Sequence, residues 1–517
     1  MNCHIDFRHM SDLAFCYKRA DLLGPLKRLS LALSFALAGP AQGQQTVLNL
    51  RDLDGSNGVS LQGTDIGGRS GLSVAGGGDI NGDGFQDFAI GAPFAEYGEF
   101  AGKVFVVFGG RLSGQSTARL SDISAGDGYV VTGGAIRTYA GSKVDIVRDM
   151  NGDGLADLLV QSGAPEGQDG GTYVVFGGSS TSNVQLDNLD PKLGITIAGS
   201  WASGVGDING DGLSDIGFQC SNAELTRTDA CFLFGSSAPF PALVSRQYLT
   251  DGQGLIVSQE AMDTGSFLID GAGDFNGDGV QDFLFRVGCC EVGLVFGSQT
   301  GLPNVIDPKD LNGLNGLNFS VTGLSDLQAR GAGDINADGI DDLVMGARRF
   351  GVPPFRNRGA VFVVYGSRSP FPATFQVAGL SPAAGTWIVG AKSGDSLGRS
   401  LDAAGDVNGD GIDDIIVGAT GIAVGGGAYV LFGGPGSLGS AAQGSLVSAL
   451  DGIVLLGTVR TDYAGSSISG AGDVNGDGLA DVIIGAPLAD PGFSTEGESY
   501  VVYGNNPNRI YANGFER

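Results

Sequence analysis

A nine-residue pattern of oxygen-bearing side chains, Asp-x-Asn-x-Asp-Gly-x-x-Asp, recurs along the chain. The first copy begins at Asp79, and six further copies begin at Asp149, Asp207, Asp274, Asp334, Asp406 and Asp473. Calcium takes hard oxygen ligands, and a short loop can supply them at alternating positions. Glycine at position 6 permits the sharp turn that such a loop needs around the ion. The pattern therefore predicts calcium chemistry, repeated along the chain.

Each copy is expected to bind one calcium ion, which gives about seven ions per chain. Positions 1, 3, 5 and 9 supply side-chain oxygens, and position 7 offers its backbone carbonyl. The predicted ligands are Asp79, Asn81, Asp83, Phe85, Asp87, Asp149, Asn151, Asp153, Leu155, Asp157, Asp207, Asn209, Asp211, Leu213, Asp215, Asp274, Asn276, Asp278, Val280, Asp282, Asp334, Asn336, Asp338, Ile340, Asp342, Asp406, Asn408, Asp410, Ile412, Asp414, Asp473, Asn475, Asp477, Leu479 and Asp481.

Two other structures use similar residues. Asn, Asp and Gly favour tight turns in any protein, but seven complete copies make an incidental turn a poor explanation. An EF-hand loop begins in the same way, yet it closes with Glu at position 12 and continues as a helix. Position 12 is apolar in every copy here, as Ile90, Val160, Phe218, Phe285, Met345, Val417 and Ile484. The loop is therefore expected to join two strands, with the Asp at position 9 closing the site.

The elements that hold these loops are predicted from the spacing. Successive copies start 70, 58, 67, 60, 72 and 67 residues apart. An apolar run such as 415–417 follows each loop, and strand-like segments such as 104–108, 129–133 and 465–471 complete a unit of four strands. Seven such units predict an all-β, seven-bladed β-propeller of four-stranded antiparallel blades over residues 45–504. We expect the strand at 47–50 to pair with the last strand, which ends at Tyr503, and so to close the ring.

The motifs that flank the loops resemble the FG-GAP repeats of the integrin α propeller. Gly-Ala-Pro follows the loop at 91–93, 163–165 and 485–487, and partial forms stand at 346–348 and 418–420. Integrins keep the ion loop in only some blades, whereas all seven units have it here. The resemblance implies a calcium-binding adhesion or ligand-binding module, with a protein or glycan partner at a cell surface.

The chain ends indicate export. Residues 1–43 contain Lys27 and Arg28 before an apolar run at 29–38, which is typical of a signal peptide. Residues 505–517 are expected to form a short tail outside the repeats. Elsewhere the sequence has no apolar stretch long enough to span a membrane. We expect a secreted or cell-surface protein, with the periplasm as an alternative.

Cysteine usage also suits an exported protein. Cys220 and Cys231 bracket the turn between two expected strands of the third unit, and we expect them to form a disulfide. The state of the adjacent Cys289 and Cys290 is left open.

Composition excludes some functions and leaves others open. A net charge of -27 disfavours nucleic acid, because phosphate binding needs Lys and Arg. Both histidines, His4 and His9, lie in the signal segment, which argues against His-based catalysis and predicts a protein that is not an enzyme. Two alternatives remain, a polysaccharide hydrolase or lyase that uses carboxylates and a structural protein of the cell envelope.

One basic and aromatic cluster is the candidate ligand-binding surface. In antiparallel blades, the segments after Gly-Ala-Pro emerge at the end opposite the calcium loops. Aromatic residues and Arg are common in binding hot spots. The candidates in the fifth unit are Arg348, Arg349, Phe350, Phe355, Arg356 and Arg358, and the first unit adds Phe94, Tyr97 and Phe100.

Overall fold

The computed structural model describes residues 45–505, apart from 97–98, 135–136, 164–170, 179–181, 223–226, 259–267, 288–290, 322–323, 325–326, 352–353, 435–437, 439–442, 460 and 491–494. The expected signal segment, most of the expected tail, Tyr97, Cys289 and Cys290 lie outside the described residues. Within the described part, no helix is long and apolar enough to cross a membrane.

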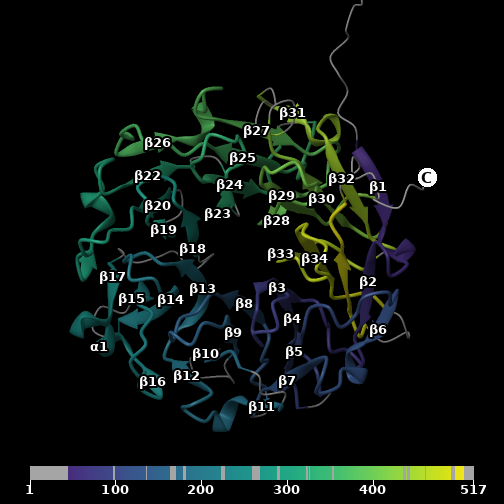
Figure 1. Ribbon diagram of the computed structural model, residues 1–517. Helices are drawn as coiled ribbons and strands as arrows, with labels where there is room; N and C mark the ends of the chain where they lie inside the picture. The colour runs from purple at the N-terminus through teal and green to yellow at the C-terminus, as the bar shows by residue number, and fades with distance from the viewer. Residues whose placement is uncertain are drawn as a thin grey trace, which may run out of the picture. The chain divides into compact units, whose positions relative to one another are not determined.

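The described chain forms seven β-sheets that follow one another around a ring, so the predicted seven-bladed β-propeller is confirmed (Figure 1). We number the blades 1 to 7 by the motif copy that each contains. The strands nearest the axis are β3 (Ser73–Gly78), β8 (Lys143–Val147), β13 (Ser200–Gly206), β18 (Ile269–Gly273), β23 (Leu327–Gly333), β28 (Leu397–Gly405) and β33 (Ser467–Gly472). The second strands are β4 (Asp87–Ala92), β9 (Asp157–Gln161), β14 (Asp215–Asn222), β19 (Asp282–Val287), β24 (Asp342–Ala347), β29 (Asp414–Ala419) and β34 (Asp481–Ala486).

The outer strands complete each sheet. The third strands are β5 (Lys103–Val107), β10 (Thr172–Val175), β15 (Arg227–Leu233), β20 (Glu291–Val295), β25 (Ala360–Val364), β30 (Gly427–Leu431) and β35 (Glu498–Val502). The fourth strands are β7 (Gly128–Thr132), β12 (Gly194–Ile197), β17 (Gly254–Val257), β22 (Gly316–Ser320), β27 (Gly385–Val389), β32 (Gly452–Leu456) and β2 (Gly58–Gln62). The fifth strands are β11 (Val184–Gln185), β16 (Leu243–Val244), β21 (Val305–Ile306), β26 (Thr374–Gln376), β31 (Ser445–Leu446), β1 (Gln45–Asn49) and β6 (Thr117–Arg119).

The blades have five strands, not the four expected from the sequence. The additional strand comes from the following unit and pairs in parallel with the fourth strand, as β11 does with β7. Most of these strands lead into a single 3-10 turn, whereas β16 of blade 2 leads into the short helix α1 (Arg246–Tyr248). Segments of only two or three residues carry too little alternation to be recognised as strands in a sequence.

The ring is closed by the N-terminal part of the chain, but not by the expected segment. Strand β2 pairs antiparallel with β35, with Ser60 opposite Tyr500. The segment expected to close the ring instead forms β1, which pairs in parallel with β32 of blade 6, Val47 opposite Val454. That expectation was wrong. The segment forms an outer fifth strand, on which Val47 is exposed. Strand β2 is almost wholly buried, because a fourth strand lies between two neighbouring strands.

The core lies between adjacent blades. Every residue of β24, β29 and β34 is buried, because each second strand is covered by a blade on either side. Strands buried on both faces read as continuous apolar runs without alternation. The apolar run after each motif copy is therefore the sequence signature of blade stacking.

Candidate calcium loops and the opposite face

Each motif copy is the connection between the first and second strands of its blade. In blade 1, β3 ends at Gly78 and β4 begins at Asp87, so positions 1 to 8 form the turn and position 9 opens the next strand. The same relation holds in the other six blades. Because all seven turns join equivalent strands, they lie at one end of the sheets. We call them loops 1 to 7, and the end that they occupy the loop face.

Within a loop, short hydrogen bonds fold the backbone around the acidic side chains. Asp79 Oδ1 accepts the N–H of Gly82 at 2.6 Å, and its Oδ2 accepts that of Gly84 at 2.9 Å. Asn81 Oδ1 accepts the N–H of Asp83 at 2.8 Å, and Asp83 Oδ1 in turn accepts that of Phe85 at 3.1 Å. Gly82 and Gly84 have φ values of 78° and 90°, which a residue with a Cβ adopts at a cost. The predicted ligands at positions 1, 3 and 5 are therefore gathered around one tight turn.

The carboxylate at position 9 is buried and connects the loop to the third strand. Asp87 has no exposed surface; its Oδ2 accepts the N–H of Ile80 at 2.8 Å and its Oδ1 that of Gly109 at 2.9 Å. Gly109 belongs to the aromatic–Gly element, and a Cβ there would lie 2.3 Å from the carbonyl oxygen of Gln86. The equivalent pairs of N–H donors are Met150 and Gly177, Ile208 and Gly235, Phe275 and Gly297, Ile335 and Gly366, Val407 and Gly433, and Val474 and Gly504. The recurrence of glycine after the aromatic residue thus has a steric and a hydrogen-bonding cause.

Burial makes these carboxylates costly in the charged form. Burial is the main reason that the pKa of Asp87 rises to about 7, and the nearby charges of Asp79 and Asp83 add to this rise. The two backbone N–H donors oppose it, because they stabilise the ionised form. The pKa of Asp157, Asp414 and Asp481 likewise rises to about 7 and that of Asp215 and Asp342 to about 8, and Asp282 shifts in the same direction. Across the described residues, no Lys or Arg forms an ion pair with any of these seven carboxylates. A cation placed beside them would reverse the shift.

The donor set fits a hard cation, although its atoms are not arranged in a coordination shell. In the part of the chain that the structure describes, no three His, Cys, Asp or Glu side chains converge as metal ligands. The loop oxygens accept backbone N–H groups instead. In loop 5, however, Asn336 Oδ1 is buried and has no hydrogen-bond partner among the described residues. This unpartnered oxygen belongs to the same loop as the buried Asp342, which forms no ion pair in the described part of the chain, and it is the feature that favours a bound cation.

The loops also connect neighbouring blades. The carbonyl at position 2 of each loop accepts an N–H from the following blade, at 2.7–3.0 Å, from the residue after the aromatic–Gly element. The bond from Gly110 to Val474 continues this series across the ring closure. The donors in order are Gly178, Ser236, Ser298, Ser367, Gly434, Asn505 and Gly110. Each loop thus contacts the seam between two blades.

The candidate ligand cluster of blade 5 lies in the connection between β24 and β25, at the end of the sheet opposite the loops. We call this end the far face. Arg349, Phe355 and Arg356 are exposed, and the Arg358 guanidinium stands 4.8 Å from the centre of the Phe355 ring. Phe350 packs against Phe362 and Trp387, with ring centres 6.2 and 6.0 Å away, so it is half-buried against the core and not part of an exposed cluster. In blade 1, Phe94 and Phe100 both pack on Tyr139.

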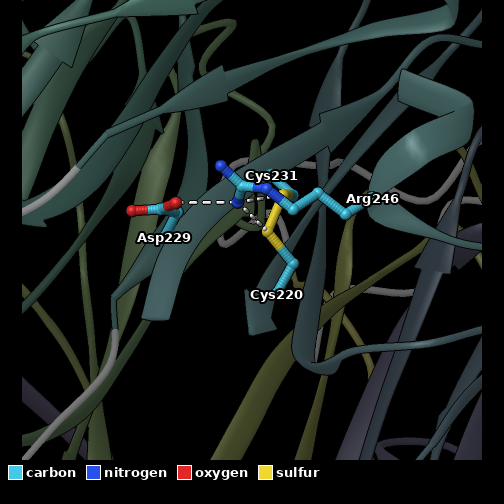
Figure 2. Close-up of a disulfide and its surroundings, with 4 residues drawn as sticks. All are labelled: Cys220, Asp229, Cys231 and Arg246. Atoms are coloured by element: carbon cyan, nitrogen blue, oxygen red, sulfur yellow. Dashed lines mark hydrogen bonds and ion pairs between the residues drawn. A yellow bond between two sulfur atoms is a disulfide. The ribbon is translucent and has the colours of Figure 1, made fainter. Parts of the chain in front are cut away.

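A disulfide joins Cys220 and Cys231, with their Cα atoms 5.8 Å apart on paired strands β14 and β15. Figure 2 shows Arg246 extending from α1 to this bridge. Its Nη1 atom lies 2.7 Å from Asp229 Oδ2 and 3.3 Å from Cys220 Sγ. The bridge therefore links the second and third strands of blade 3 shortly after loop 3, and Arg246 connects them to α1.

A charged cluster on the innermost strands was not predicted from the sequence. Arg330 Nη1 lies 3.2 Å from Asp270 and 3.6 Å from Asp402, which are carried by β23, β18 and β28. On β8, Lys143 Nζ donates to Ser203 Oγ at 2.6 Å. These strands line the axis, where the sheets come closest together (Figure 1). Isolated charges in short Gly-rich strands carry no sequence signal, because their partners lie about 60 residues or more away along the chain.

The fold and the loops together define a seven-bladed β-propeller with one acidic loop in each blade, and parts of it match a known repeat family. Residues 70–107, 331–364 and 464–503 match the FG-GAP repeat family. These stretches fall in blades 1, 5 and 7.

The chain is also similar to parts of much longer proteins. It is 29% identical over 233 residues to integrin alpha pat-2 of Caenorhabditis briggsae, covering 41% of this chain and 17% of the relative. It is 32% identical over 130 residues to human integrin alpha-6, covering 24% of this chain and 10% of that protein. It is 31% identical over 169 residues to human phosphatidylinositol-glycan-specific phospholipase D, covering 32% of this chain and 19% of that protein. The chain thus spans less than a fifth of the length of these relatives.

Proposed function

We propose that this chain is an exported propeller that binds calcium in its seven loops and uses the far face to bind a partner at a cell surface. The observation that carries the proposal is the sevenfold repetition of a buried carboxylate at position 9 without a cationic partner in the described residues. Calcium, when bound, would neutralise the acidic groups of each loop.

Under this proposal the two ends of the blades have different tasks. The loop face would hold the blades together, because each loop already contacts the seam with the following blade. The far face would present connections of variable length on a rigid scaffold, which is where binding residues are commonly carried. The exposed Arg349, Phe355 and Arg356 of blade 5 remain the candidates for contact with a protein partner.

The similarity to integrin α chains supports adhesion or ligand binding as the role. The similarity to a phospholipase D supports a second candidate, an enzyme. The described region of this chain contains no histidine, since His4 and His9 both precede it. A catalytic role would therefore depend on carboxylates, as in the hydrolysis or elimination of a polysaccharide.

The test is a pull-down of the full chain on cell surfaces and immobilised polysaccharides, with calcium and with chelator. We expect capture only in calcium, without release of unsaturated or reducing-end products. The variant with Arg349, Phe355 and Arg356 changed to Ala should lose a protein partner, while Asp410→Ala in loop 6 should lower stability in calcium. Equal capture in chelator, or product release, would contradict the adhesion proposal.

A further inference from the structure

The far face carries a groove of about 520 Å³ between blades 6 and 7. The connection between β29 and β30 forms one wall, with Thr420 and Val424. The opposite wall is formed by Thr461 and Tyr463, which precede β33, and Ser396 before β28 closes one end. A volume between about 300 and 1,000 Å³ is typical of sites for small molecules.

The same place in blades 1 and 2 is filled. Two bridges establish the equivalence of the positions, Gly102 with Ala140 and Gly426 with Ala464, so Tyr139 corresponds to Tyr463. Tyr139 is stacked on Phe100, with ring centres 6.1 Å apart, and packs edge-on against Phe94 at 5.5 Å. Three aromatic rings thus occupy this part of the seam between blades 1 and 2.

In blades 6 and 7 the two phenylalanines are replaced by smaller residues. Val424 lies two residues before Gly426, just as Phe100 lies two residues before the equivalent Gly102. Gly421 is the second residue after the end of β29, and Phe94 is the second residue after the end of the equivalent strand β4. Gly421 and Val424 cannot give Tyr463 the two ring contacts that Tyr139 has; Tyr463 is 50% exposed and Val424 is 62% exposed. The surface beside this tyrosine is therefore open.

The lining indicates the class of ligand. Among the described residues that line the groove, hydroxyl groups come from Ser396, Thr420 and Thr461, and none of the side chains is ionisable except the phenol of Tyr463. An aromatic ring offers a flat apolar surface, and hydroxyl groups both donate and accept hydrogen bonds. A sugar ring has the matching surface, with an apolar face of C–H groups and an edge of hydroxyls. A charged ligand would find no counter-charge among these groups.

We propose that this groove, which we call the Tyr463 groove, binds a neutral saccharide, with one sugar ring stacked on Tyr463 and its hydroxyls bonded to Ser396, Thr420 or Thr461. The inference rests on the proposed ligand-binding role of the far face and assigns a ligand class and a site to it. The site is separate from the basic and aromatic cluster of blade 5.

The test uses the full chain saturated with calcium and a panel of neutral trisaccharides of glucose, mannose, galactose and N-acetylglucosamine, measured by titration calorimetry. Tyr463→Ala removes the ring, and Val424→Phe fills the groove as Phe100 does in blade 1. Tyr139→Ala is the matched control, because it removes the equivalent tyrosine where no groove is open. We expect at least one trisaccharide to bind, both groove variants to weaken binding roughly tenfold or more, and the control to leave it unchanged.

Unchanged melting temperatures in calcium would show that the groove variants fold. Absence of binding across the panel, or binding that survives both groove variants, would overturn the proposal. So would capture of a neutral peptide library by the wild type that Val424→Phe abolishes, since the groove would then bind peptides. If the panel fails while calcium-dependent capture on cells persists, only the saccharide site is refuted; if both fail, the proposed function falls too.

Discussion

Replacing the carboxylate at position 9 of one loop by an amide should stabilise the protein in chelator, and calcium should cancel or reverse that gain. In loop 6, Asp414 accepts N–H groups from Val407 and Gly433, both at 2.9 Å, and burial raises its pKa to about 7 from an ordinary value of 3.8. At pH 8 the folded protein must hold this group ionised. Since a tenfold change in acidity is about 1.4 kcal/mol, the ionised group costs about 4 kcal/mol without a cation. Asp414→Asn removes that cost but leaves one buried N–H without an acceptor, a loss of about 1–3 kcal/mol.

The variant should therefore be about 1–3 kcal/mol more stable than wild type in chelator at pH 8. Calcium at about 100 times its dissociation constant adds about 2.7 kcal/mol per site to the wild type, and the variant should not receive this contribution from loop 6. Urea unfolding in both solutions measures the change. The neighbouring Asp413, which accepts the N–H of Asp334 at 3.0 Å and is not a predicted ligand, is the control as Asp413→Asn. An equal effect of Asp414→Asn in both solutions would mean that the carboxylate only anchors the loop.

Two further predictions concern other parts of the fold. Changing both Cys220 and Cys231 to Ser should lower the free energy of unfolding, measured in urea, by about 3 kcal/mol. Dithiothreitol should not lower the stability of this variant further. Equal stability of variant and wild type would show that the bridge adds nothing. Near the axis, burial raises the pKa of Asp270 to about 6, against the lowering effect of Arg330 and Lys143. The folded protein therefore holds a proton that the unfolded chain has lost, so this group's contribution to stability falls as the pH rises from 4 to 6, by up to about 1.4 kcal/mol per pH unit. Asp270→Asn should remove that part of the slope, and an identical pH profile for variant and wild type would refute it.

Much of the architecture could be predicted because one repeated motif fixes it. The Asp at position 9 is followed at once by an apolar run, since it begins a strand covered on both sides, and the spacing of the motifs gives the number of blades. The fifth strands and the ring closure could not be predicted. Val47 and Leu48 are as apolar as the residues of β2, and only the pairing partners distinguish the outer strand from the closing one.

The candidate sites were predictable to different degrees. Positions within a loop follow from local chemistry, and the disulfide follows from two cysteines that flank one hairpin turn. The Tyr463 groove could not be predicted, because it depends on small residues, Gly421 and Val424, that lie some 40 residues before the tyrosine in the chain. Phe350 was grouped with an exposed cluster, but its position in the sequence cannot reveal that its ring packs on Trp387.

The most direct test of the central claim is the number of calcium ions bound per chain, counted by equilibrium dialysis and elemental analysis of the full protein. Extracellular calcium modules have dissociation constants of about 10⁻⁴ to 10⁻³ M, so the dialysis should reach about 10 mM calcium. Seven equivalent loops predict about seven ions, with release of all of them in excess chelator and a large fall in melting temperature. A count near zero, or a melting temperature that does not respond to chelator, would contradict the account.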